Sequence, residues 1–80
     1  MTADDDATDV RAELQSVEEE LAELRNQVAE ARSRIGDRSD APMDSAELAA
    51  ELTAVEEQEA IVRLLERRAE RLRERLAERG

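Results

Sequence analysis

Three aspartates lie close together near the middle of the chain: Asp37, Asp40 and Asp44. Clustered carboxylates can hold a hard cation such as Mg²⁺ through their oxygen atoms. The spacing lacks the ligand rhythm and central glycine of an EF-hand loop, whereas aspartate is a common turn and helix-capping residue. The sequence therefore favours turn and cap roles. We expect no metal or cofactor, with Asp37 and Asp40 as the candidate ligands if a cation binds.

Five arginines recur at every fourth position close to the C-terminus: Arg63, Arg67, Arg71, Arg75 and Arg79. An unbroken basic face could bind the phosphate backbone of a nucleic acid. Here four glutamates, beginning with Glu66, run beside the arginines, so a self-paired helix surface is favoured.

The whole chain carries 22 acidic and 12 basic residues, a net charge of −10. This excess repels nucleic acids and anionic membranes, and we expect neither as the primary ligand.

The remaining polar residues give little basis for catalysis. The chain has no His, Cys, Phe, Trp or Tyr, and each of its basic residues is an arginine. Hydroxyls such as Ser16 and Thr53 therefore have no imidazole or amine to activate them. We expect a protein that is not an enzyme. The absence of cysteine, of a long apolar run and of a signal-peptide core favours the cytoplasm.

The elements that carry these residues are predicted from apolar spacing and turn residues. Residues 1–8 are predicted to form a disordered acidic tail, residues 9–35 a helix capped by Asp9, and residues 36–43 a loop. Gly36 stands where a helix C′ residue is expected. In the first helix the apolar steps alternate between four and three residues, which is a heptad pattern. The seam comprises Val10, Leu14, Val17, Leu21, Leu24, Val28, Ala31 and Ile35.

A second helix is predicted over residues 44–79, so the hairpin covers residues 9–80. Asp44 and Glu47 have the spacing of a capping box, and Met43 and Leu48 that of a hydrophobic staple. Its seam comprises Leu48, Val55, Val62, Leu65, Ala69, Leu72 and Leu76. Leu52 and Ile61 are predicted to widen this seam. Gln58 also lies in this seam. It either fixes the alignment of the helices or lies at the edge of the seam.

The two seams predict an all-α fold, an antiparallel two-helix coiled-coil hairpin. Pairing residues whose numbers add to about 83 makes apolar layers, with Leu14 opposite Ala69 and Leu21 opposite Val62. The same pairing places Arg63, Arg67 and Arg68 opposite Glu13 and Glu18–Glu20. The longer second helix then leaves Leu72 and Leu76 without a partner. We therefore expect a homodimer, as a four-helix bundle, or docking onto a partner helix. The predicted interface residues are Leu14, Leu21, Leu24, Val28, Val55, Val62, Leu65, Leu72 and Leu76.

The loop and the second helix also carry a family resemblance. The segment from Gly36 to Ala41, followed by Glu56-Glu57-Gln58 and Ile61, resembles the coiled-coil arm of bacterial Gre-type transcript cleavage factors. The resemblance implies a hairpin that enters the secondary channel of RNA polymerase. It also implies that the matching tip acids, Asp37 and Asp40, help to bind the second catalytic magnesium and provoke RNA cleavage.

Three functions follow as hypotheses. The first is a protein–protein interaction module, acting as a scaffold, adaptor or regulator through the heptad seams. The alternative is a transcription modulator that inserts the acidic tip of the hairpin into polymerase. The third is an enzyme of a helical dimer that uses arginine and glutamate on an anionic substrate.

Overall fold

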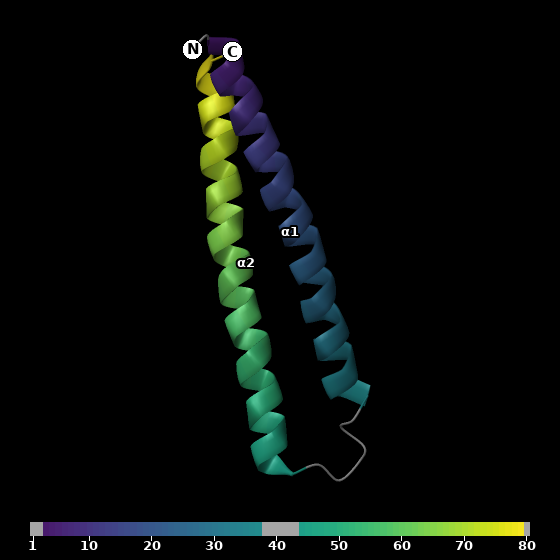
Figure 1. Ribbon diagram of the computed structural model, residues 1–80. Helices are drawn as coiled ribbons and strands as arrows, with labels where there is room; N and C mark the ends of the chain where they lie inside the picture. The colour runs from purple at the N-terminus through teal and green to yellow at the C-terminus, as the bar shows by residue number, and fades with distance from the viewer. Residues whose placement is uncertain (1–2, 38–43, 80) are drawn as a thin grey trace.

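The computed structural model describes residues 3–37 and 44–79, which form two helices arranged as a hairpin (Figure 1). Helix α1 spans Ala3–Asp37 and helix α2 spans Ser45–Arg79, and each has 35 residues. The helices run in opposite directions and pack against each other, so the first turn of α1 and the last turn of α2 lie at the same end. The molecule measures 61 × 17 × 15 Å. The predicted all-α hairpin is confirmed.

Helix α1 begins at Ala3, before the predicted cap Asp9. The prediction of a disordered tail over residues 1–8 is therefore wrong for residues 3–8. Residues 4–6 are all aspartates in the first turns of α1, where backbone N–H groups lack partners within the helix. Carboxylates are favoured at this end because the helix dipole is positive there. An acidic run that is typical of a solvated tail thus also suits the start of a helix.

The C-terminal end of α1 also differs from the prediction. The helix continues through Gly36 to Asp37, and no described residue has a positive φ. Gly36 is therefore an ordinary helical residue, and its predicted role as a left-handed C′ cap is wrong. A Cβ placed on Gly36 would meet no atom within 4 Å. Neither backbone conformation nor crowding requires a glycine here.

The start of α2 agrees with the sequence. The N–H of Ala46 donates to Oδ1 of Asp44 at 3.2 Å, and the N–H of Leu48 donates to the Asp44 carbonyl oxygen at 3.0 Å. These bonds confirm Asp44 as the N-cap: its side chain satisfies the Ala46 amide, which has no helical partner, and its carbonyl oxygen accepts the first helical bond of α2. Met43, the predicted staple partner of Leu48, lies outside the described residues.

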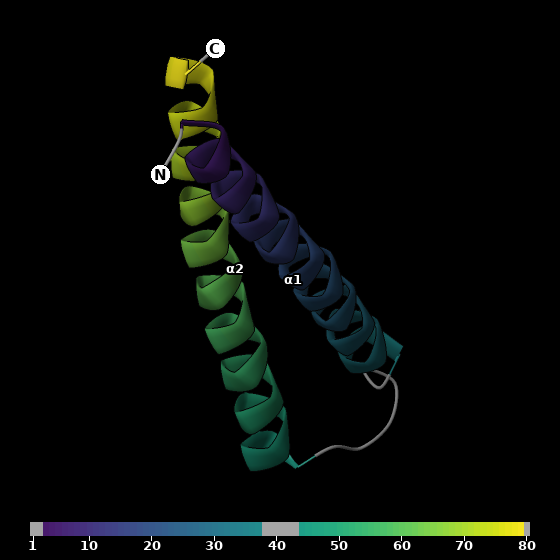
Figure 2. The same cartoon turned by 45° about the horizontal axis from the view of Figure 1, so that its top comes forward.

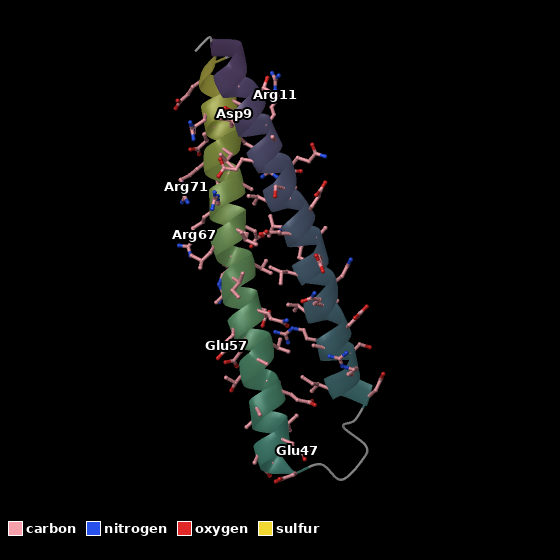
Figure 3. The ribbon with its side chains drawn as sticks, viewed as in Figure 1. Asp9, Arg11, Glu47, Glu57, Arg67 and Arg71 are labelled. Carbon is pink, nitrogen blue, oxygen red and sulfur yellow. The ribbon has the colours of Figure 1, made fainter. Side chains whose placement is uncertain are left out.

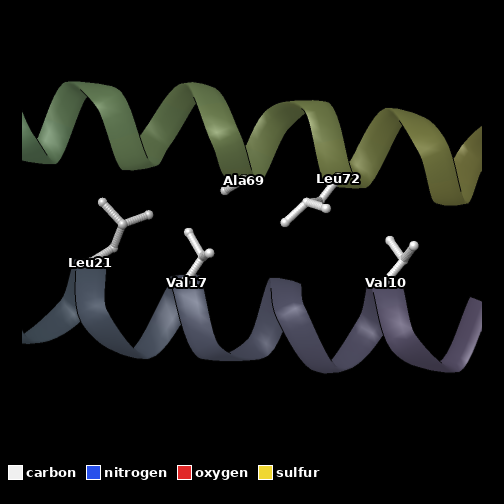
Figure 4. Packing of buried hydrophobic residues seen from close by; sticks show 5 residues of the cluster. All are labelled: Val10, Val17, Leu21, Ala69 and Leu72. Atoms are coloured by element: carbon white, nitrogen blue, oxygen red, sulfur yellow. The ribbon is translucent and has the colours of Figure 1, made fainter.

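The core of the hairpin lies near the chain ends (Figure 4). Val10, Val17 and Leu21 of α1 and Ala69 and Leu72 of α2 form one buried cluster. Ala69 is completely buried, because its short side chain lets the facing helix come close to its backbone. Four half-buried residues complete the packing around the cluster: Leu14, Val62, Leu65 and Leu76.

The observed alignment differs from the predicted pairing. Figure 4 shows Ala69 nearest to Val17 among the labelled residues of α1, and Leu72 between Val17 and Val10. The prediction that Leu72 has no partner within the hairpin is therefore wrong, as is the same prediction for Leu76. The physical reason is the alignment itself, which places Leu72 between Val17 and Val10, two residues of the helix that the sequence predicts.

Packing weakens along the hairpin from the chain ends to the loop. We call residues 3–21 and 62–79 the terminal half, and residues 22–37 and 44–61 the loop half. The helices are close together in the terminal half and diverge towards the loop (Figures 1 and 2). In the described part of the loop half only Val55 is buried, while Val28, Ile35 and Leu48 are half-buried. The heptad pattern therefore gives a tight contact over only part of its length.

Candidate interaction surface

The predicted interface residues mainly hold α1 against α2. Leu21, Val55 and Leu72 are each 3–4% exposed, so a second chain cannot reach them in this hairpin. The remaining six are half-buried: Leu14, Leu24, Val28, Val62, Leu65 and Leu76. The seams that the sequence offers to a partner are thus largely occupied within one chain.

The structure describes only one of the two predicted tip acids. Asp37 is exposed at the last residue of α1, and Asp40 lies outside the described residues. Within residues 3–37 and 44–79, no group of three acidic residues is arranged to hold a metal ion.

Charged side chains connect the two helices on the surface. In an antiparallel pair of helices, facing residues have numbers with a constant sum. Three of the four inter-helix ion pairs join residues whose numbers add to 91, so the same alignment is kept along the described helices. The predicted contact of Arg68 with Glu13 is confirmed, whereas Arg63 and Arg67 make no ion pair among the described residues. Exposed pairs of this kind select an alignment more than they stabilise it. The pairs are Arg25–Glu66 (2.9 Å), Arg32–Glu59 (2.5 Å), Arg73–Glu18 (3.8 Å) and Arg68–Glu13.

One of these pairs changes the ionisation of its members. The hydrogen bond from Arg68, followed by its charge, lowers the pKa of Glu13 below the ordinary value of 4.5, and the charge of Arg75 adds a smaller effect. The same contact raises the pKa of Arg68. The shifts reflect the pairing of exposed charges across the hairpin and create no acid–base pair suited to catalysis.

Gln58 finds a polar partner on the facing helix. Its Nε2 donates to Oε1 of Gln27 at 3.4 Å, and the Gln58 side chain is half-buried. A polar pair at the helix contact favours the alignment that brings both amides together. This contact is consistent with a role for Gln58 in fixing the alignment.

The exposed large apolar residues of the described chain lie on α2. Leu64 is 60% exposed, Ile61 46% and Leu52 39%. Leu52 and Ile61, which the sequence predicts to widen the seam, are partly covered, and Ile61 lines a groove with Val55 and with Ile35 of α1. Ile61 and Leu64 are three positions apart and belong to one side of the helix.

Charged residues extend the surface around Leu64 in both directions. Glu57 and Arg71 lie seven positions before and after Leu64, a spacing that keeps them on the same face. In Figure 3, Glu57, Arg67 and Arg71 project from α2 on the side turned away from α1. We call this surface the outer strip of α2. It comprises Glu57, Ala60, Ile61, Leu64, Arg67 and Arg71.

Two open grooves flank the contact between the helices, one in the loop half and one across its boundary with the terminal half. One of about 440 Å³ includes Ala31, Ile35, Val55 and Ile61, so it borders the outer strip. The other, of about 380 Å³, includes Val28 and Val62, and the pairs Arg25–Glu66 and Arg32–Glu59 lie along its walls. A further groove of about 420 Å³ lies beside Leu21 and Ala69 in the terminal half, so grooves flank the helix contact in both halves.

The outer strip was not found by sequence reasoning, although a signal was present. Residues 61–65, Ile-Val-Arg-Leu-Leu, hold four large apolar residues within five positions. Five consecutive residues cover more than a full turn of helix, so they cannot all face one neighbour. Their density therefore indicates a second apolar side on α2.

Comparisons with protein-family models, with curated proteins and with solved structures find no match to this chain. Neither described helix is long and apolar enough to cross a membrane.

Proposed function

We propose that this chain is a helical interaction module of the cytoplasm, a scaffold, adaptor or regulator that binds another helix through the outer strip of α2. The supporting observation is the exposure of Leu64 and Ile61 beside unpaired charges on one side of α2. Burying such side chains against a partner contributes about 1.5–3 kcal/mol each at full burial. The surrounding charges add selectivity between partners.

The hairpin supports this role by leaving the outer strip accessible. The seam residues and inter-helix ion pairs connect α1 to the opposite side of α2, so a partner can bind without displacing α1. The proposal therefore modifies the mechanism that the seams predict, in which the same residues both build the hairpin and bind the partner. It assigns the chain no catalytic step.

A photo-crosslinking amino acid placed at Leu64 tests the proposal in the native cell. The matched control places it at Ala12, which is exposed on α1. We expect discrete adducts from position 64, none from position 12, and loss of the position-64 adducts when Ile61→Glu is added. Circular dichroism checks that each variant remains helical. Adducts from both positions alike, or from neither, would overturn the proposal.

A further inference from the structure

The centre of the outer strip is suited to contact with a copy of itself. Leu64 is the most exposed of the large apolar residues in the described chain, and Ile61 lies one turn before it. Leu64 is also close to the middle of α2, which spans Ser45–Arg79. Two antiparallel α2 helices that meet at Leu64 therefore overlap along nearly their whole length.

Charge is distributed unequally along α2, and the inequality selects the direction of pairing. Residues 45–61 contain five glutamates and no arginine, whereas residues 62–79 contain seven arginines and four glutamates. A parallel pair of α2 helices places the acidic parts side by side and the arginine-rich parts side by side. An antiparallel pair places each acidic part against an arginine-rich part, which is the favourable arrangement.

Individual residues agree with this arrangement. In an antiparallel pair centred on Leu64, positions equally far before and after residue 64 lie opposite each other. Glu57 is seven positions before and Arg71 seven after, so each Glu57 faces Arg71 of the partner subunit. Neither residue has an ion pair within the described chain. Likewise Ile61 faces Arg67 of the partner subunit, whose aliphatic stem can cover it.

We infer that the outer strip binds a second copy of this chain, with the two α2 helices antiparallel about a twofold axis at Leu64. The interface is isologous, so the Glu57–Arg71 pair occurs twice. The inference rests on the proposed function and names the partner. Helix α1 stays on the far side of each α2, so the assembly has four helices with the α2 pair at its centre.

The chain contains no cysteine, which allows a direct test of this geometry. A residue on the twofold axis can form a disulfide with its own copy, because the two Cα atoms come within bonding range. We expect rapid oxidation of Leu64→Cys to a covalent dimer. Leu52→Cys, at an exposed leucine outside the outer strip, serves as the control and should not form a covalent dimer. Glu57→Cys should not self-link but should join Arg71→Cys when the two proteins are mixed.

Charge reversal provides a second test, read by sedimentation equilibrium between about 1 and 500 µM. Glu57→Arg alone and Arg71→Glu alone each place like charges opposite each other twice. We expect the dimer dissociation constant to rise roughly tenfold or more in each. The double variant restores opposite charges and should return to within about threefold of the unchanged protein. Glu23→Arg, an equal charge change at an exposed position on α1, should leave dissociation unchanged.

The outcomes separate this inference from the proposed function. A monomer at 500 µM that still gives Leu64 adducts with another protein overturns the inference and leaves the function standing. A monomer without Leu64 adducts overturns both. A dimer in which Leu64→Cys does not self-link, or in which the double charge variant is not restored, uses a different surface and also overturns the inference.

Discussion

The terminal half and the loop half of the hairpin have similar sequence patterns but different packing. Both have apolar residues at heptad spacing, yet only the terminal half encloses a cluster of buried side chains. Ala69 lies within that cluster and is fully buried, so the helices approach closely there. In the loop half Val28, Ile35 and Leu48 are only half-buried and the helices diverge, although that half also has a small seam residue, Ala31. A heptad pattern alone therefore does not specify how closely two helices pack.

Matched leucine truncations give the largest expected effect on this comparison. Leu72→Ala removes a buried side chain from the terminal half and should lower the free energy of unfolding by about 2–4 kcal/mol. Leu48→Ala makes the same chemical change at a half-buried position of the loop half and should cost about 1 kcal/mol. Urea unfolding followed by circular dichroism measures both. Equal losses would show that the two halves are packed alike.

Removing the cap of α2 tests how the loop half is held. Asp44→Ala deletes the side-chain acceptor for the Ala46 amide and should cost about 1 kcal/mol. Hydrogen exchange should become faster in the first turn of α2 and remain unchanged around Ala69. Ser45→Ala, at the neighbouring exposed position, is the control. Faster exchange throughout both halves would mean that the hairpin unfolds as one unit and lacks a weaker end.

A stabilising change is expected at the other helix end in the loop half. Gly36→Ala adds a methyl group where no atom lies within 4 Å and where φ is negative. Reduced freedom of the unfolded chain and better helix propensity should raise stability by about 0.5–1 kcal/mol. Thermal unfolding of Gly36→Ala measures this gain in stability. Gly36→Pro is measured beside it for comparison. A loss of stability with alanine would mean that residue 36 needs a conformation that only glycine adopts.

The smallest effect is expected from an exposed ion pair in the terminal half. Because the pKa of Glu13 is lowered in the folded protein, the pair stabilises the fold above the ordinary carboxyl pKa of 4.5. This contribution is lost as the pH falls through the lowered folded-state pKa. Glu13→Gln should therefore have a lower melting temperature than the unchanged protein at pH 7, and the difference should shrink below pH 4. Glu23→Gln controls for the loss of one negative charge. A difference that persists at low pH would exclude the ion pair as its cause.

The sequence predicts the fold well because both helices have strong local signals. Asp44 caps α2 as its position predicts, and the alternating spacing from Val10 to Ile35 falls within one helix. The helix start at Ala3 was missed because acidic residues favour both a solvated tail and a helix N-terminus. The local pattern alone does not separate these two outcomes.

The alignment of the helices was harder to predict than their existence. Seams with steps of three and four residues give apolar layers in more than one antiparallel alignment. The pairing of Leu14 with Ala69 and the observed packing of Ala69 beside Val17 both satisfy the pattern. Side-chain size and the ion pairs decide between them. The outer strip was missed for a related reason. The sequence interpretation assigned one apolar stripe to α2, whereas the apolar residues around Leu64 form two stripes.

The position of the helix ends has a consequence for an assembly of two copies. The first turn of α1 and the last turn of α2 lie at one end of each hairpin (Figure 1). In the antiparallel dimer these ends point in opposite directions. The two Arg79 residues lie 15 positions on either side of the axis at Leu64, so anything joined at these ends would be held about 45 Å apart at 1.5 Å per residue. Such a dimer would work as a spacer of set length between two attached molecules.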